Sequence, residues 1–319
     1  MTKPMQWDEA QIGRRFRLRD LHVLFTVAQS GSMGKAALKL GVSQPTVSEV
    51  VAGLENLVGA QLFERSARGI QLTPYGDALL KRSQNVFDEL KQGLRDLQYL
   101  SDPTVGELRI GCPESITSSI LPPVLDNFWR QHPQVRVHTS PASGSVLDLP
   151  QLRAREIDLF VGLTQTERGG DEFDVETLFN DRAVVAVGLT NPLARRRKVS
   201  FEELMIHPWL MTGQHSRNYQ ILVEATRTRG LQMPRIVLDS MSVHMRTRLL
   251  ATGPYVTMLP NSVLRSNAER FSLKMLNVDI PADPWPVVIA TLKNRVLTPL
   301  ALKFVDHLRA CVRNCLKLQ

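Results

Sequence analysis

Residues 31–59, GSMGKAALKLGVSQPTVSEVVAGLENLVG, decide the fold of the N-terminal part of the chain. Their apolar residues recur at three- and four-residue spacings, which is typical of short amphipathic helices. Ser32 and Ser43 stand where N-caps are expected, and Pro45 suits the first turn of the helix that follows Ser43. Gly41 lies between the two segments and can adopt the positive φ that ends a helix. The stretch therefore predicts two helices joined by a tight glycine turn.

The flanking segments extend this unit. Before it, one helical face is expected to consist of Leu18, Leu21, Leu24, Phe25 and Ala28. After it, residues 62–65 and 69–73 form two short extended runs around a basic turn, which predicts a β-hairpin wing. Arg65 and Arg68 in this wing are candidates to lie along phosphates or to enter a narrow minor groove.

A helix-turn-helix unit presents its second helix, N-terminus first, to the major groove of DNA. At that N-terminus, Gln44 can pair with an adenine edge, and Thr46 can meet a thymine methyl group. Ser32 and Ser48 have the right size for phosphate contacts at positive helix ends. These residue types in this order predict a DNA-reading surface.

Residues 17–76 resemble the DNA-binding domain of LysR-type transcriptional regulators nearly end to end. The matching motifs are Leu18-Arg19-Asp20-Leu21, Gly31-Ser32, Ala36-Ala37, Ser43-Gln44-Pro45-Thr46-Val47-Ser48, Leu54-Glu55, Gly59, Leu62-Phe63-Glu64-Arg65 and Leu72-Thr73-Pro74-Tyr75-Gly76. The resemblance implies a winged helix-turn-helix at 16–76, and residues 1–15 before it are expected to form a flexible tail. It implies DNA contacts at Ser32, Gln44, Pro45, Thr46, Ser48, Arg65 and Arg68. One departure is that many members carry a bulkier or polar residue, often threonine, where Met33 or Gly34 stands.

A long helix is expected next, from Pro74 to about residue 100, with Thr73 as its N-cap candidate. At 1.5 Å per residue it is about 40 Å long. Its apolar stripe consists mainly of Leu80, Phe87, Leu90, Leu94 and Leu97. Such a stripe favours a partner helix, although a helix packed within its own chain is the alternative. We therefore assign residues 77–102 to a linker and dimerisation helix.

From residue 103 onward, β-rich runs alternate with helical patterns, which predicts an α/β domain with parallel strands at 106–111, 135–138 and 157–162. One helix is expected from 113–118 through Phe128, and another from 143–145 to about Ala154. This half resembles the effector-binding domain of the same family, which is similar to a small two-lobed periplasmic binding protein. The resemblance implies lobe I at 105–180 and 281–319, and lobe II at 181–280.

Candidate effector contacts lie at expected strand ends and helix starts beside the cleft between the lobes. They are Ser115, Thr117, Ser145, Leu163, Thr212, His215 and His244. The serines and Thr117 have a plainer interpretation as helix caps, and the two histidines as solvent-exposed loop residues. If the histidines do face the cleft, they favour an anionic effector. We expect no other cofactor and no metal.

Three further features have two interpretations each. Cys112 ends an expected strand near the cleft, so it is either an oxidant sensor or a buried thiol. One helix face is expected to carry His307, Cys311 and Cys315 at four-residue steps. These residues are either zinc ligands or part of an ordinary terminal helix. The basic run at 195–198 is either a solvated turn or a second DNA contact. The plainer interpretation is favoured in all three.

The composition sets limits on the function. The net charge of +8 is compatible with a polyanionic partner. The N-terminal residues lack a secretory signal, and three cysteines are too few for a disulfide framework, so we expect a cytoplasmic protein with no membrane partner. A transport binding protein and an enzyme are the competing classes, but neither an export signal nor a catalytic motif supports them.

The sequence therefore predicts a bacterial transcriptional regulator that is not an enzyme. Its expected partners are double-stranded promoter DNA and copies of itself, as a homodimer or homotetramer through the linker helix. RNA polymerase is left open as a further partner. The effector is expected to be a small, anionic metabolite bound between the two lobes.

Overall fold

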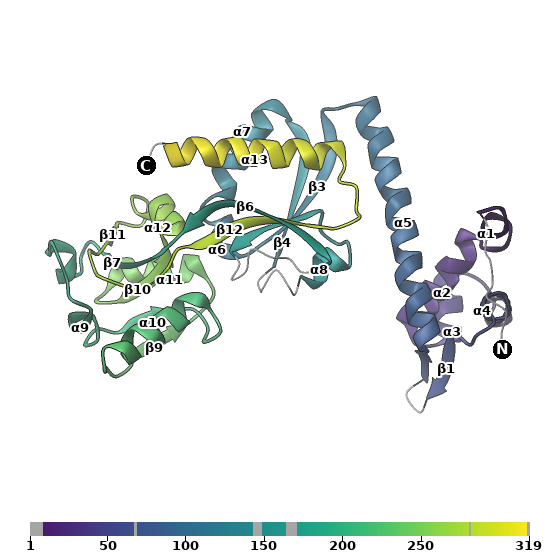
Figure 1. Cartoon of the computed structure of the whole chain (residues 1–319), viewed down its shortest axis with the longest axis horizontal. Coiled ribbons are helices and arrows are strands. Elements are labelled where there is room, and N and C mark those ends of the chain that lie inside the picture. Colours follow the sequence, from purple (N-terminus) through teal and green to yellow (C-terminus); the bar gives the residue numbers. More distant parts are fainter. Residues whose placement is uncertain (1–8, 67–68, 143–148, 164–170, 281, 318–319) are drawn as a thin grey trace. The chain divides into compact units, whose positions relative to one another are not determined.

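The computed structural model describes residues 9–66, 69–142, 149–163, 171–280 and 282–317. The chain divides into two compact units, residues 1–94 and 95–319 (Figure 1), and each is described by itself. The division falls within the long helix α5 (Pro74–Ser101).

The first unit is a helical core with a two-stranded wing. Its helices are α1 (Glu9–Arg15), α2 (Leu18–Ser30), α3 (Met33–Leu40) and α4 (Gln44–Val58). Gly31, Gly41 and Gly59 all have φ near +60 to +70° and end α2, α3 and α4, as glycine can at low steric cost. The buried core includes Leu24, Val27, Ala36, Val47 and Leu62. Residues 9–15, expected in a loose tail, form α1 instead.

The wing strands β1 (Phe63–Ser66) and β2 (Gly69–Leu72) pair in antiparallel register, as expected for a hairpin. Thr73 follows them, and its hydroxyl accepts a hydrogen bond at 3.1 Å from the Gly76 N–H, in the first turn of α5. The same hydroxyl donates to the carbonyl oxygen of Gln61 at 2.6 Å. Thr73 therefore joins the start of the long helix to the end of the helix-turn-helix.

In the second unit, lobe I contains a five-stranded sheet of order β4-β3-β5-β12-β6. Its strands are β3 (Val105–Cys112), β4 (Gln134–Pro141), β5 (Leu159–Leu163), β6 (Phe173–Asp181) and β12 (Trp285–Leu292). As expected, β3 runs parallel to β4 and β5, whereas β12 is antiparallel to both of its neighbours. Val287 and Ile289 pack on the face covered by α7 (Leu121–Gln131) and α13 (Pro299–Lys317) (Figure 1). Val288 and Ala290 face the opposite core, as strand alternation requires.

Lobe II contains a second five-stranded sheet of order β11-β7-β10-β8-β9. Its strands are β7 (Ala183–Gly188), β8 (Trp209–Met211), β9 (Ile236–Asp239), β10 (Val256–Pro260) and β11 (Leu273–Met275). Its helices are η1 (Pro192–Arg195), α9 (Phe201–Leu204), α10 (Arg217–Thr228), α11 (Val243–Thr252) and α12 (Asn261–Asn267). Lobe I is discontinuous in sequence because the chain leaves it after β6 and returns with β12.

Two expected helices differ from the sequence prediction. The first is divided into α6 (Glu114–Thr117) and α7, because Pro122 and Pro123 lack the N–H groups that would bond back to residues 118 and 119. The second is reduced to α8 (Pro150–Arg153), and residues 143–148 before it are not among those described. Within the described chain, none of the helices combines the length and apolar character needed to span a bilayer.

Candidate DNA-binding surface and interlobe cleft

The N-terminus of α4 is built as the sequence predicted. The Ser43 hydroxyl accepts a hydrogen bond from the Thr46 N–H at 3.3 Å and lies 2.8 Å from the Thr46 hydroxyl. Thr46 is therefore half-buried and engaged with the cap, whereas Gln44, Pro45 and Ser48 are exposed. Because Val47 on the opposite face is fully buried, the tip of α4 is held by the core and presented to solvent.

Ser32 and Gln44 lie near each other, at the starts of α3 and α4. A Cβ atom built on Gly34 would be 3.6 Å from Oε1 of Gln44 and 3.9 Å from Oγ of Ser32. Ser32 stands at the N-cap position of α3, but its hydroxyl makes no capping hydrogen bond, contrary to the expected cap. A side chain at position 34 would therefore contact both polar side chains.

The wing is anchored to the helical core by backbone and carboxylate contacts. The Ile70 N–H donates to the Gly31 carbonyl oxygen at 3.1 Å. Oε1 of Glu55 accepts hydrogen bonds from the Leu62 N–H at 2.8 Å and the Phe63 N–H at 3.3 Å. Glu55 lies in one of the matching motifs, but no role was predicted for it from the sequence. Its position shows that the motif orients the wing.

The structure describes only one of the two wing arginines. Arg65 belongs to β1, where its backbone pairs with Ile70. Arg68 lies outside the described residues. Their contacts with DNA remain predictions from the sequence.

The candidate effector residues of lobe I occupy or follow strand ends. Ser115 and Thr117 lie inside α6, where Pro113 holds the N-cap position, so neither residue is the cap that the plainer interpretation suggested. The Thr117 hydroxyl donates to the Glu114 carbonyl oxygen at 3.1 Å. Leu163, at the end of β5, packs against the cores of both lobes. Ser145 is outside the described residues.

In lobe II, the candidate residues are dispersed. Thr212 follows β8, is 6% exposed, and places its hydroxyl 2.5 Å from that of Ser216, the N-cap of α10. His215 is exposed beside this cap. His244 is the second residue of α11 and is also exposed. Its ring lies edge-on to Phe271 at 5.8 Å between centroids.

A cavity of about 170 Å³ brings one candidate from each lobe together. Thr117 contributes from lobe I and His244 from lobe II, and neither Thr212 nor His215 is among the lining residues. The full lining is Thr117, Ser118, Pro122, Val243, His244, Asn267, Arg270 and Phe271. Asn267, Arg270 and Phe271 were not predicted from the sequence, because residues on α12 and just after it reach the cleft only through the tertiary fold.

Hydrogen bonds join the two lobes beside this cavity. The Asn267 side-chain amide donates to the Ser118 carbonyl oxygen at 2.9 Å. Oε1 of Glu114 accepts from the Ser242 hydroxyl at 3.2 Å and from the His244 N–H at 3.1 Å. Glu114 was not among the predicted site residues. It is the carboxylate that lobe I presents to the start of α11.

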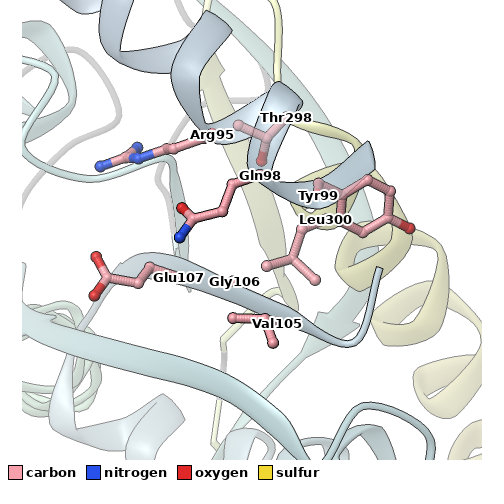
Figure 2. Close-up of a pocket in the computed structure, with 8 residues that line it drawn as sticks. All are labelled: Arg95, Gln98, Tyr99, Val105, Gly106, Glu107, Thr298 and Leu300. Carbon is pink, nitrogen blue, oxygen red and sulfur yellow. The ribbon is translucent and has the colours of Figure 1, made fainter. Parts of the chain in front are cut away.

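A second, smaller cavity of about 90 Å³ lies where the last turns of α5 meet lobe I (Figure 2). Gln98 extends from α5 toward β3, and Tyr99 lies beside Leu300. Arg95, on the same end of α5, places Nη1 3.6 Å from Oδ1 of the buried Asp158. This end of the long helix is therefore attached to lobe I by apolar packing and by an ion pair.

Cys112 favours the plainer interpretation of a buried thiol. Cys112 is 1% exposed, and burial raises the pKa of its thiol to about 11, so the thiolate that reacts with oxidants is scarce at neutral pH. Sγ of Cys311 lies 3.4 Å from Nε2 of His307, whereas the Cys315 side chain is not described. Over the described ranges, no group of three or more acidic, histidine or cysteine side chains is placed to hold a metal ion.

The basic run at 195–198 is exposed and extends from the last residue of η1 toward α9. Nη2 of Arg196 pairs with Oε1 of Glu203 at 3.2 Å, on the surface of lobe II. This placement corresponds to the solvated turn expected from the sequence.

Comparison with known proteins identifies both units. Residues 18–77 match the bacterial regulatory helix-turn-helix proteins of the lysR family, and residues 101–312 match the LysR substrate binding domain. The chain is 27% identical to the uncharacterized HTH-type transcriptional regulator YdcI of Escherichia coli (strain K12), over 87% of this chain and 90% of that protein. It is also 27% identical to the transcriptional dual regulator GltC of Bacillus subtilis (strain 168), over 91% of this chain and 95% of that protein.

Solved structures show the same fold. CbnR in full-length form, complexed with its target DNA, matches with a TM-score of 0.62 at 20% identity, over 93% of this chain and 100% of that chain. HinK, a LysR family regulator from Pseudomonas aeruginosa, matches with a TM-score of 0.53 at 25% identity, over 93% of this chain and 98% of that chain. Since the two family domains together span most of the sequence, this chain belongs to the LysR family of DNA-binding transcriptional regulators.

Proposed function

We propose that this regulator recognises a specific operator through the tip of α4 and responds to a small anionic metabolite bound between lobes I and II. One observation carries the effector part of the proposal: Thr117 and His244, from different lobes, line the same cavity. A ligand there contacts both lobes at once, so its binding energy depends on their relative position. That dependence is what allows a ligand to shift a conformational equilibrium.

The DNA part of the proposal rests on exposure and chemistry. Gln44 and Ser48 are exposed at the tip of α4, and Ser32 lies beside Gln44 at the start of α3. An exposed glutamine at this position can read an adenine edge, while hydroxyls at helix starts bind phosphates. Arg65 and Arg68 of the wing supply the sequence-independent attraction to the backbone.

The cavity chemistry supports an anionic effector. Arg270 lines the cavity, with its guanidinium 5.4 Å from the centre of the Phe271 ring. Val243 and His244 are the first residues of α11, so their N–H groups belong to the positive end of a helix. No other cofactor and no catalytic step are part of the proposal.

Self-association is proposed through α5. Five large aliphatic residues on this helix are exposed in the single chain, namely Val86, Leu90, Leu94, Leu97 and Leu100. A second copy of the helix would cover such a stripe. A two-fold dimer then predicts a partly palindromic operator whose half-sites are separated by whole helical turns of about 10 base pairs. Action at promoters places the protein in the bacterial cytoplasm, with RNA polymerase as a further candidate partner.

Footprinting of the purified full chain on the DNA upstream of its own gene tests the proposal. We expect a protected duplex region containing an interrupted inverted repeat. A thermal-shift screen of small carboxylates and aromatic acids then tests the effector part, because a bound ligand raises stability by mass action. The absence of any protected duplex would remove the DNA-binding role, and turnover of a screened compound would favour an enzyme instead.

A further inference from the structure

The start of α11 in lobe II is occupied by a carboxylate from lobe I. Oε1 of Glu114 accepts hydrogen bonds from the Ser242 hydroxyl and the His244 N–H. Ser242 is the N-cap of α11, and its hydroxyl also accepts from the Met245 N–H at 3.3 Å. Glu114 therefore supplies an acceptor to the first turn of a ten-residue helix from 130 positions away in sequence.

These donors are suited to any carboxylate. The first N–H groups of a helix have no partners within the helix, and the helix dipole adds positive charge at the same end. Hydrogen bonds from such groups to an ionised oxygen are stronger than those between neutral partners. A free carboxylate at this place would satisfy the same donors as Glu114.

A buried arginine adds positive charge to the same helix. Arg246, one turn further along α11, is 2% exposed. Its Nη1 donates to the Met258 carbonyl oxygen at 3.3 Å, whereas its Nε has no hydrogen-bond partner among the described residues. Burial lowers the pKa of Arg246 to about 10, and the negative charge of Glu114 opposes that decrease. Burying a cation is costly, so a negative charge near Arg246, here that of Glu114, is favoured.

The donor site and the cavity share His244. Its backbone N–H bonds to Glu114, and the same residue lines the cavity together with Arg270. A small ligand in the cavity is therefore adjacent to the donors that Glu114 occupies. If the ligand carried a carboxylate, it would compete with Glu114 and be repelled by its charge.

We propose that Glu114 is a built-in occupant of an anion site at the start of α11, and that a carboxylate effector binds by displacing it. This inference rests on the proposed function, since it takes the cleft between the lobes as the effector site. Displacement breaks the link that Glu114 makes between the lobes and leaves the bond from Asn267 to Ser118 in place. Effector binding is thereby coupled to the loss of the hydrogen bonds that Glu114 makes between the two lobes.

Chemical rescue with acetate tests the proposal in the full-length protein. The Glu114→Gly variant lacks the built-in carboxylate, so sodium acetate is expected to raise its melting temperature by about 2–4 °C at saturation. Wild-type protein is expected to shift far less, because its site is already filled. Sodium chloride at the same ionic strength corrects for general salt effects. Glu156→Gly, which changes an exposed acid in the same lobe, serves as the matched control.

The Glu114→Gln variant keeps the test valid if the glycine variant does not fold. It preserves side-chain size and removes the repelling charge, so acetate is expected to bind it more tightly than wild type. Equal acetate shifts in wild type, both Glu114 variants and Glu156→Gly would overturn the proposal, as would the absence of a shift in both Glu114 variants. The footprint of wild-type protein on DNA is measured separately. If the DNA-binding proposal fails, the acetate-dependent shifts in melting temperature can therefore still be interpreted.

Discussion

Asp158 and Arg295 form a buried ion pair in lobe I, with 3.2 Å between Oδ1 and Nη2 and side chains only 3% and 1% exposed. Arg109 approaches the same carboxylate, with Nη2 2.6 Å from Oδ1 and its backbone N–H 2.9 Å from Oδ2. Asp158 therefore joins β3, the start of β5 and the segment before α13. Together with Arg95, it also connects the end of α5 to the lobe.

Replacing Asp158 with Ala should lower the free energy of unfolding by about 3–5 kcal/mol, because buried guanidinium groups lose their counter-charge. Urea denaturation of the full chain measures the change. Glu156→Ala, an exposed neighbour, should change the same quantity by no more than about 0.5 kcal/mol. A loss below about 1 kcal/mol for Asp158→Ala would show that the cluster does not stabilise the fold.

Two glycines of α5 should respond in opposite directions to alanine. A Cβ atom on Gly76 would lie 2.0 Å from the Leu62 carbonyl oxygen, so Gly76→Ala should destabilise the protein by about 1–3 kcal/mol or more. A Cβ on Gly93 meets no atom within 4 Å, and alanine favours the helix, so Gly93→Ala should stabilise it by about 0.5–1 kcal/mol. Thermal unfolding of both variants gives the comparison, and equal effects would contradict it.

Replacing Gln44 with Ala should cost about 1–3 kcal/mol on the specific operator and relax base preference at one position. Selection of bound sequences from a random pool, together with gel shifts, measures both effects. Gln61→Ala provides a matched control, since Gln61 is also exposed but lies beyond the tip of α4. An unchanged base preference in Gln44→Ala would exclude Gln44 from sequence readout.

Arg65→Ala and Arg68→Ala should weaken binding to all DNA sequences alike. Each lost phosphate contact should reduce the slope of log affinity against log salt concentration by about 1. Fluorescence anisotropy at several salt concentrations measures this slope. If the slope is unaltered, the arginine concerned makes no phosphate contact.

Replacing Leu94 with Glu should shift the protein toward monomers, because the exposed α5 stripe would then carry a charge into the proposed helix pair. Leu94 is 67% exposed in the single chain, so the change should not disturb the fold of one copy. Analytical ultracentrifugation measures the association. Gln84→Glu, at an exposed polar position on the same helix, should leave the association unchanged. If Leu94→Glu also leaves it unchanged, the exposed α5 stripe is not the dimer interface.

Local signals were sufficient for the helix-turn-helix and its wing. The three- and four-residue spacing of the apolar residues predicted amphipathic helices, and Gly41 and Ser43 marked the turn and the cap, because these preferences act within a few residues. The same logic failed at 113–128, where the two prolines at the start of α7 divide what looked like a single helix. It also assigned a cap to Ser32 that the hydroxyl does not make.

The sequence by itself determined the helix-turn-helix, its wing and the cap at the start of α4, because periodicity, capping and turn chemistry are short-range properties. Only the tertiary structure brought Glu114 to His244 and Asp158 to Arg295, over separations of 130 and 137 residues. Such pairings depend on how two sheets and their connections close, and no local pattern in the chain records that geometry. For the same reason, Thr117 and His244 could be proposed separately, whereas their shared cavity could not.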